Sequence, residues 1–189
     1  RAARVLLMLV MLSFWTSILV RTASWVIILR TDGLVNGGLQ MLGLVGEPAQ
    51  LLYNRFSVYL VMVHVLMPFM ILPIYSVMKG LPPSLMKAAS SLGAPPLAAF
   101  LQVYLPLTLP GLSAGVLFTY ILALGFYITP ALVGGANDQM ISSLIARFAL
   151  GEAHWSMAAA LAIVLLVSAG LIYAVFSRIA PLERGGPIK

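Results

Sequence analysis

Long apolar runs separated by short polar connections make up most of this chain. Three of the runs exceed the roughly 20 helical residues that cross a bilayer core, and they lie at residues 5–29, 56–78 and 153–177. A fourth run, residues 88–137, has no charged residue but is divided by prolines, so its crossing is expected at about residues 107–128. The runs are too long for strands and lack a period of two. The pattern predicts an all-α membrane protein, a polytopic helix bundle with four spans.

Composition supports the same class of protein. Of the 189 residues, 61% are hydrophobic and only 8% are charged, and the mean hydropathy is +1.04. Soluble domains carry roughly 25% charged residues. The basic residues are scattered singly, which argues against nucleic-acid binding despite a net charge of +6. The chain has no cysteine, which excludes disulfides and thiolate metal sites.

The charges divide unequally between the two sides of a four-span bundle. One side holds a large basic excess, and the other side balances its basic and acidic residues. The excess marks the cytoplasmic side, and with four spans both ends of the chain would lie there. The basic residues of that side are Arg1, Arg4, Lys79, Lys87, Arg178, Arg184 and Lys189, against one acid, Glu183.

Residues 81–105 then form a cytoplasmic loop, too short to cross the membrane. Pro82-Pro83 suits the start of a helix, Gly93 suits the residue just past its end, and Pro95-Pro96 opens a second helix. The loop is therefore predicted to be a helix, a glycine turn and a helix. An apolar stripe on the first helix, formed by Leu81, Leu85, Ala88/Ala89 and Leu92, either packs on the membrane or its own bundle, or docks a cytoplasmic partner.

The stretch Lys87-Ala88-Ala89-Ser90-Ser91-Leu92-Gly93, followed by Leu105-Pro106 and Pro110-Gly111, resembles the EAA loop of ABC importer permeases. The family's leading glutamate is replaced by Lys87. In that family the loop forms coupling helices that sit in a cleft of the ATP-binding subunit. The resemblance therefore implies that the residues for coupling to an ATPase are Lys87, Ala88, Ala89, Leu92 and Gly93.

Further stretches resemble the permeases of the spermidine/putrescine group: 13–25 followed by 32–36, then 66–75 and 126–135. The resemblance covers nearly the whole chain as a single type I permease domain, residues 1–189, and matches about the C-terminal two thirds of a six-span permease. Two N-terminal spans are thus expected to be missing. It implies a bacterial inner-membrane protein with its C-terminus in the cytoplasm. The implied partners are two ATP-binding subunits, a second permease subunit and an extracytoplasmic solute-binding protein.

Broken helices at membrane depth suggest where a solute passes, because they are tolerated only against protein or a cavity. Pro130 and Gly134-Gly135 break the third span, so Tyr127 and Thr129 are the first candidates for the translocation path. Arg21 either snorkels to the interface or faces a water-filled path or the external binding protein. The remaining candidates, ranked after Tyr127 and Thr129, are Trp15, Thr16 and Trp25.

Other motifs favour packing over chemistry. Gly111-Leu-Ser-Ala-Gly115 fits a nucleophile elbow, but within an apolar helix it is better explained as a small-residue packing face. His64 stands alone on an apolar helix and is interpreted as a packing residue. No phosphate-binding loop of the Walker type occurs, so the expected protein is not an enzyme, holds no cofactor or metal, and relies on ATP hydrolysis in a partner. A channel or secondary transporter subunit is the alternative.

Overall fold

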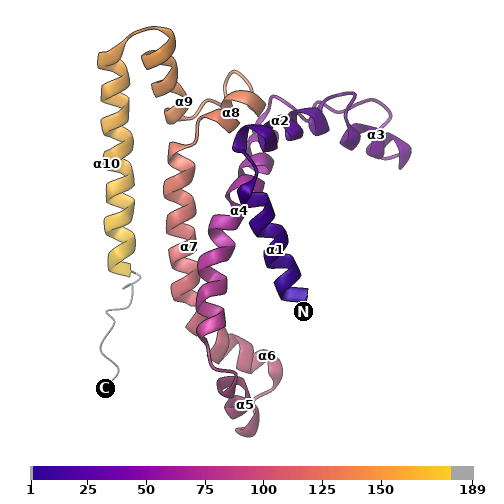
Figure 1. Cartoon of the computed structure of the whole chain (residues 1–189), viewed down its shortest axis with the longest axis vertical. Helices are drawn as coiled ribbons and strands as arrows, with labels where there is room; N and C mark the ends of the chain where they lie inside the picture. The colour runs from indigo at the N-terminus through magenta and orange to yellow at the C-terminus, as the bar shows by residue number, and fades with distance from the viewer. Residues whose placement is uncertain (1, 180–189) are drawn as a thin grey trace. The chain divides into compact units, whose positions relative to one another are not determined.

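The computed structural model describes residues 2–179, which form helices joined by loops (Figure 1). Of the charges used to assign the two sides of the membrane, Arg1, Glu183, Arg184 and Lys189 lie outside the described residues. The chain divides into two compact units. The first is Arg1–Pro68 with Leu122–Ala169, and the second is Phe69–Ile121 with Gly170–Lys189.

Among the described residues, three helices are long and apolar enough to span a membrane: Arg55–Gly80, Pro96–Gly125 and Trp155–Arg178. The first is α4 (Arg55–Gly80), and the last lies within α10 (Trp155–Ile179). Both agree with the predicted runs at 56–78 and 153–177. They follow directly from the length of the uncharged runs, since a buried backbone in lipid must satisfy its own hydrogen bonds.

The first predicted span, residues 5–29, is not one straight helix. It is divided into α1 (Ala2–Trp15) and α2 (Ile18–Leu29). The helical segment Val5–Trp15 is bent by 100° from the following segment Ile18–Met41, which continues past α2. Taken as a single broken span, this pair gives a fourth crossing. The break falls at Thr16-Ser17, where no proline or glycine marks it. The hydroxyl of Thr16 donates to the Ser13 carbonyl at 2.7 Å and so takes up one of the carbonyls that the end of α1 leaves free.

The third span begins earlier than the predicted residues 107–128. A continuous helical segment runs from Pro96 to Gly125, through α6 (Pro96–Ala99), a π-helical turn η1 (Phe100–Tyr104) and α7 (Leu105–Gly125). In the π turn, the Leu105 N–H bonds to the Phe100 carbonyl, five residues back. This wider turn lies immediately before Pro106 and accommodates a residue that has no N–H to donate. The helix therefore continues through the prolines and ends at Gly125.

In the first unit, α2 packs against α8 (Ile128–Val133) and α3 (Leu34–Met41), and α8 contacts α9 (Ile141–Ala146). A second π-helical turn, η2 (Arg147–Gly151), extends α9. The core combines apolar and polar side chains, all at most 1% exposed: Leu29, Val61, Val65, Val133, Thr22, Asn36, Ser57 and Thr129. A core this polar depends on internal hydrogen bonds.

In the second unit, the Gly111–Gly115 face of α7 lies directly on α4. A Cβ atom added at Gly111 would stand 2.9 Å from Val77 Cβ and 3.0 Å from the Pro73 carbonyl oxygen, and one at Gly115 would stand 3.0 Å from the Met70 carbonyl oxygen. The packing interpretation of this motif is confirmed. Ser113 Oγ donates to the Pro110 carbonyl of its own helix at 2.9 Å, as an ordinary helical serine does.

Candidate functional site

The segment between α4 and α7 has the helix–turn–helix shape that the sequence predicts. The helix α5 (Ser84–Ser91) ends in a turn, and Pro95 leads into α6. Gly93 has a φ of +83°, the left-handed conformation that favours glycine. Its N–H bonds to the Ser90 carbonyl and the Ala94 N–H bonds to the Ala89 carbonyl, which is a Schellman cap. The cap fixes the direction in which the chain leaves α5.

The residues of the EAA-like stretch divide into an inner and an outer set. Ala89 is buried where α5 contacts α6 and η1, and Ala99 is buried on α6. Lys87 and Ala88 are exposed, and Leu92 is 88% exposed. The predicted stripe from Leu81 to Leu92 is therefore not one surface. Ala89 packs inside the hairpin, whereas Ala88 and Leu92 face outward.

Arg21 stabilises the break between α1 and α2. Its Nη2 donates to the Thr16 carbonyl at 2.8 Å and lies 3.5 Å from the Phe14 carbonyl. Carbonyls at a helix end lack partners within the helix, and a cation there also complements the helix dipole. The Nε and Nη1 atoms are buried without a hydrogen-bond partner among the described residues. Arg21 thus has an architectural role that the sequence did not indicate, and two N–H groups left over.

A second polar group lies between α2, α4 and α8. The hydroxyls of Thr22 and Thr129 are 3.1 Å apart, and both residues are fully buried. Trp25 Nε1 donates to His64 Nδ1 at 3.1 Å, with the two rings edge to face. Because Nδ1 accepts this bond, the neutral imidazole carries its proton on Nε2. His64 therefore has a specific partner as well as a packing role, and no local pattern in the sequence points to that bond.

Two of the predicted translocation residues meet directly, because Arg21 donates to the Thr16 carbonyl at 2.8 Å, whereas Thr129 and Trp25 each bond to a residue outside the predicted set. Thr129 is locked to Thr22, and Trp25 is bound to His64. Trp15, at the end of α1, is 86% exposed, and Tyr127, just before α8, is 41% exposed. The break at residues 126–127 is present, and Ser142 Oγ donates to the Phe126 carbonyl there. Whether any of these side chains meets a solute stays a prediction.

Comparison with known proteins identifies the class to which these apolar helices and the capped hairpin belong. Residues 1–181 match the family described as "Binding-protein-dependent transport system inner membrane component". The chain belongs to this family. It is 35% identical over 177 residues to the spermidine/putrescine transport system permease protein PotB of Escherichia coli strain K12. That alignment covers 94% of this chain and 64% of the relative, so the chain spans less than two thirds of that protein's length.

Two other proteins extend the comparison. The inner membrane ABC transporter permease protein YdcU of E. coli strain K12 is 35% identical over 187 residues, covering 92% of this chain and 59% of YdcU. Among solved structures, a bacterial ABC transporter involved in the import of the acidic polysaccharide alginate has the same fold. It superimposes with a TM-score of 0.77 at 19% identity, covering 96% of this chain and 66% of that one. The expected family and fold class are confirmed.

Proposed function

We propose that this chain is a pore-forming subunit of an ATP-driven importer of small organic solutes, polyamines such as spermidine or putrescine first among them. The observation that carries the proposal is the α5–α6 hairpin, which joins a fixed turn to outward-facing apolar side chains. Leu92 is 88% exposed and Leu97 is 70% exposed. An apolar surface on a polar loop favours a protein partner, and the relatives named as spermidine/putrescine permeases support the solute class.

The partner that fits this surface is an ATP-binding subunit, with two copies for two permease subunits. Closure of the ATPases on nucleotide would push the hairpin, and the push would pass to the membrane helices through α4 and α7, which directly adjoin it in the chain. Because the hairpin is closed by a Schellman cap and by the contacts of α5 with α6 and η1, it would move as one body. This arrangement puts ATP hydrolysis in the partner and the C-terminus in the cytoplasm.

A second permease subunit is supported by α10. Within the described residues, none of its 18-residue apolar window is buried inside the chain. Lipid would cover part of that surface, and a neighbouring permease would cover the rest. An extracytoplasmic solute-binding protein would deliver the solute on the opposite side from the hairpin.

The test compares two matched glycines. Gly93 (φ +83°) and Gly43 (φ +68°) both have left-handed backbones, and at both an added Cβ would meet open space, but only Gly93 lies in the hairpin. Aspartate at either position meets a similar backbone strain. We expect Gly93→Asp to insert normally and to lower ATP-driven spermidine uptake into proteoliposomes at least tenfold. Gly43→Asp should retain most of the uptake.

Co-purification in mild detergent tests whether the same variants still bind an ATP-binding subunit. The wild-type chain and the Gly43→Asp variant should bring down an ATP-binding subunit in stoichiometric amount, and Gly93→Asp should not. Uptake by Gly93→Asp at the wild-type rate would remove the coupling role from the hairpin. A wild-type chain that purifies without an ATPase and transports without ATP would refute the importer proposal itself.

A further inference from the structure

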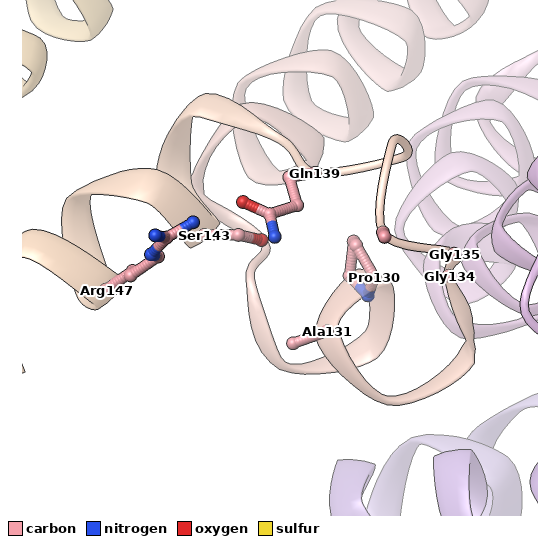
Figure 2. Close-up of a pocket in the computed structure, with 8 residues that line it drawn as sticks. Pro130, Ala131, Gly134, Gly135, Gln139, Ser143 and Arg147 are labelled. Atoms are coloured by element: carbon pink, nitrogen blue, oxygen red, sulfur yellow. The ribbon is translucent and has the colours of Figure 1, made fainter. Parts of the chain in front are cut away.

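A pocket of about 290 Å³ lies in the first unit, beside the end of α8 (Figure 2). One wall is formed by Pro130 of α8 and by the turn after that helix, with Gly134 and Gly135, and the other by Gln139, α9 and its extension η2. The glycines keep the first wall free of side chains. A Cβ at Gly134 would stand 2.5 Å from the Pro130 carbonyl oxygen, and one at Gly135 would stand 2.6 Å from the Tyr53 carbonyl oxygen. The polar side chains of the pocket therefore come from the second wall.

That wall presents three hydrogen-bond donors in a row. Ser143 and Arg147 line the pocket four residues apart on one helix face of α9 and η2, and Gln139 lines it from the loop that precedes α9. Figure 2 shows the side chain of Gln139 extending from that loop toward Ser143. The Ser143 hydroxyl is buried and has no hydrogen-bond partner among the described residues. A buried hydroxyl without a partner is uncommon in a native protein and indicates that something absent from the free chain can satisfy it.

Arg147 supplies the charge. Its Nε bonds to Glu152 Oε1 at 2.8 Å, and the described residues offer its two Nη groups no other bond. The lining residues include no carboxylate. The nearby Asp138 accepts from Arg55 Nε at 3.0 Å through Oδ1, and its Oδ2 lies behind Gly135, 3.1 Å from where a Cβ of that residue would stand. An amide, a hydroxyl and a guanidinium, with no acid between them, suit a carboxylate, which accepts several such bonds at once.

The source of that carboxylate follows from the proposed function, on which this step rests. A polyamine is a cation, and a guanidinium in the wall would repel it. The predicted charge asymmetry puts residues 130–147 on the extracytoplasmic side, where the solute-binding protein arrives. We propose that the pocket receives an aspartate or glutamate side chain of the solute-binding protein when that protein docks. A volume of about 290 Å³ accommodates one such side chain with its adjoining backbone.

Arg30 provides a matched control for Arg147. Each forms one ion pair through Nε, Arg30 with Asp32 at 3.1 Å and Arg147 with Glu152 at 2.8 Å, and their side chains are 59% and 58% exposed. Arg30 does not line this pocket. The complete transporter would be placed in nanodiscs, and the affinity of its own spermidine-loaded solute-binding protein would be measured by fluorescence at low and high salt.

We expect Arg147→Gln to weaken binding about tenfold at low salt, Ser143→Ala to weaken it about threefold, and Arg30→Gln to change it less than twofold. Higher salt should reduce the Arg147 effect, because screening weakens partly exposed charge pairs. Alanine substitution of the acids on the binding protein's docking face should then identify one whose loss is not additive with Arg147→Gln. At a saturating concentration of the solute-binding protein, spermidine uptake by the Arg147→Gln transporter should return to the wild-type rate.

Other results overturn the proposal. Equal weakening by Arg147→Gln and Arg30→Gln would mean that net charge, not the pocket, attracts the partner. Binding that is insensitive to Arg147 and Ser143 would remove the docking role. If those variants instead raise the KM for a carboxylate-bearing solute without changing docking, the pocket takes solute. Failure of the unmodified transporter to bind any binding protein would refute the proposed function together with this site.

Discussion

The bond between Thr22 and Thr129 joins α2 to α8 and offers a sharp test of the polar core. The two hydroxyl oxygens are 3.1 Å apart and neither residue is exposed. Replacing one threonine by valine keeps the shape of the side chain and leaves the other hydroxyl without this partner. An unsatisfied buried hydroxyl costs about 1–3 kcal/mol in soluble proteins. Between membrane helices, where the hydroxyl can bond back to its own helix, couplings average about 0.6 and reach about 1.7 kcal/mol.

We therefore expect Thr22→Val and Thr129→Val each to lower the free energy of unfolding by about 1 kcal/mol. The double variant should lose no more than the larger single effect, because both polar groups are then gone. The interaction energy of the cycle would be about 0.6–1.5 kcal/mol. Unfolding in mixed micelles of increasing SDS content, followed by far-UV circular dichroism, measures all four proteins.

Thr108 provides the control for this cycle. Its hydroxyl donates to the Leu105 carbonyl within α7 at 2.8 Å. Combined with Thr129→Val, the change Thr108→Val should be additive within about 0.3–0.5 kcal/mol, as expected of sites without a shared partner. If the Thr22 and Thr129 effects are also additive within that range, the hydroxyl pair does not stabilise the α2–α8 contact, and the reasoning is refuted.

Two further predictions concern packing and the short helix α3. Gly111→Ala should lower the thermal unfolding midpoint, because its Cβ would stand 2.9 Å from Val77 Cβ. Gly125→Ala is the control and should leave the midpoint unchanged, because a Cβ there would meet open space. Equal midpoints for the two variants would contradict close packing of α7 on α4. Asn36→Ala should lower the free energy of unfolding by about 1–3 kcal/mol, because it removes the hydrogen bonds to the Ala49 N–H and carbonyl, both 2.9 Å long. Gln40 is exposed, so Gln40→Ala should have little effect in the same SDS titration.

The lengths of the membrane helices could be predicted from the sequence, whereas the bends within the spans could not. Uncharged runs set α4 and α10 because lipid permits few alternatives to a helix. The prolines at 106 and 110 suggested a boundary, but a π turn immediately before Pro106 accommodates its missing N–H, Pro110 lies inside α7, and the helix continues. The break at Thr16-Ser17 has no local marker. Its partners, such as the Arg21 guanidinium, lie in the following helix, and hydropathy cannot detect them.

In the candidate site, too, some features could be predicted from the sequence and others could not. Gly93 and the Pro95-Pro96 pair encode the hairpin locally, so the turn was predictable. The separation of Ala88 from Ala89 was not, because it depends on where α6 and η1 lie after the turn. Ser143 and Arg147 show a four-residue spacing in the sequence, but on a short helix such spacing usually describes a solvated face, and only the buried Ser143 hydroxyl distinguishes it. Gln139 reaches the pocket from the loop before α9, through an extended backbone at Met140 that helical spacing does not predict.

The Thr22–Thr129 bond also sets an order of events during biosynthesis. The two residues are 107 positions apart, so the ribosome must add more than a hundred residues before α2 can meet its partner on α8. At roughly 5–20 residues per second, that interval is roughly 5–20 s. Throughout it, the first apolar stretch lacks the contact that fixes α2 against α8. Until then α2 is held by Thr16 and Arg21 at the break, by its contacts with α3 and by the Trp25–His64 bond, and its position against α8 is set late in translation.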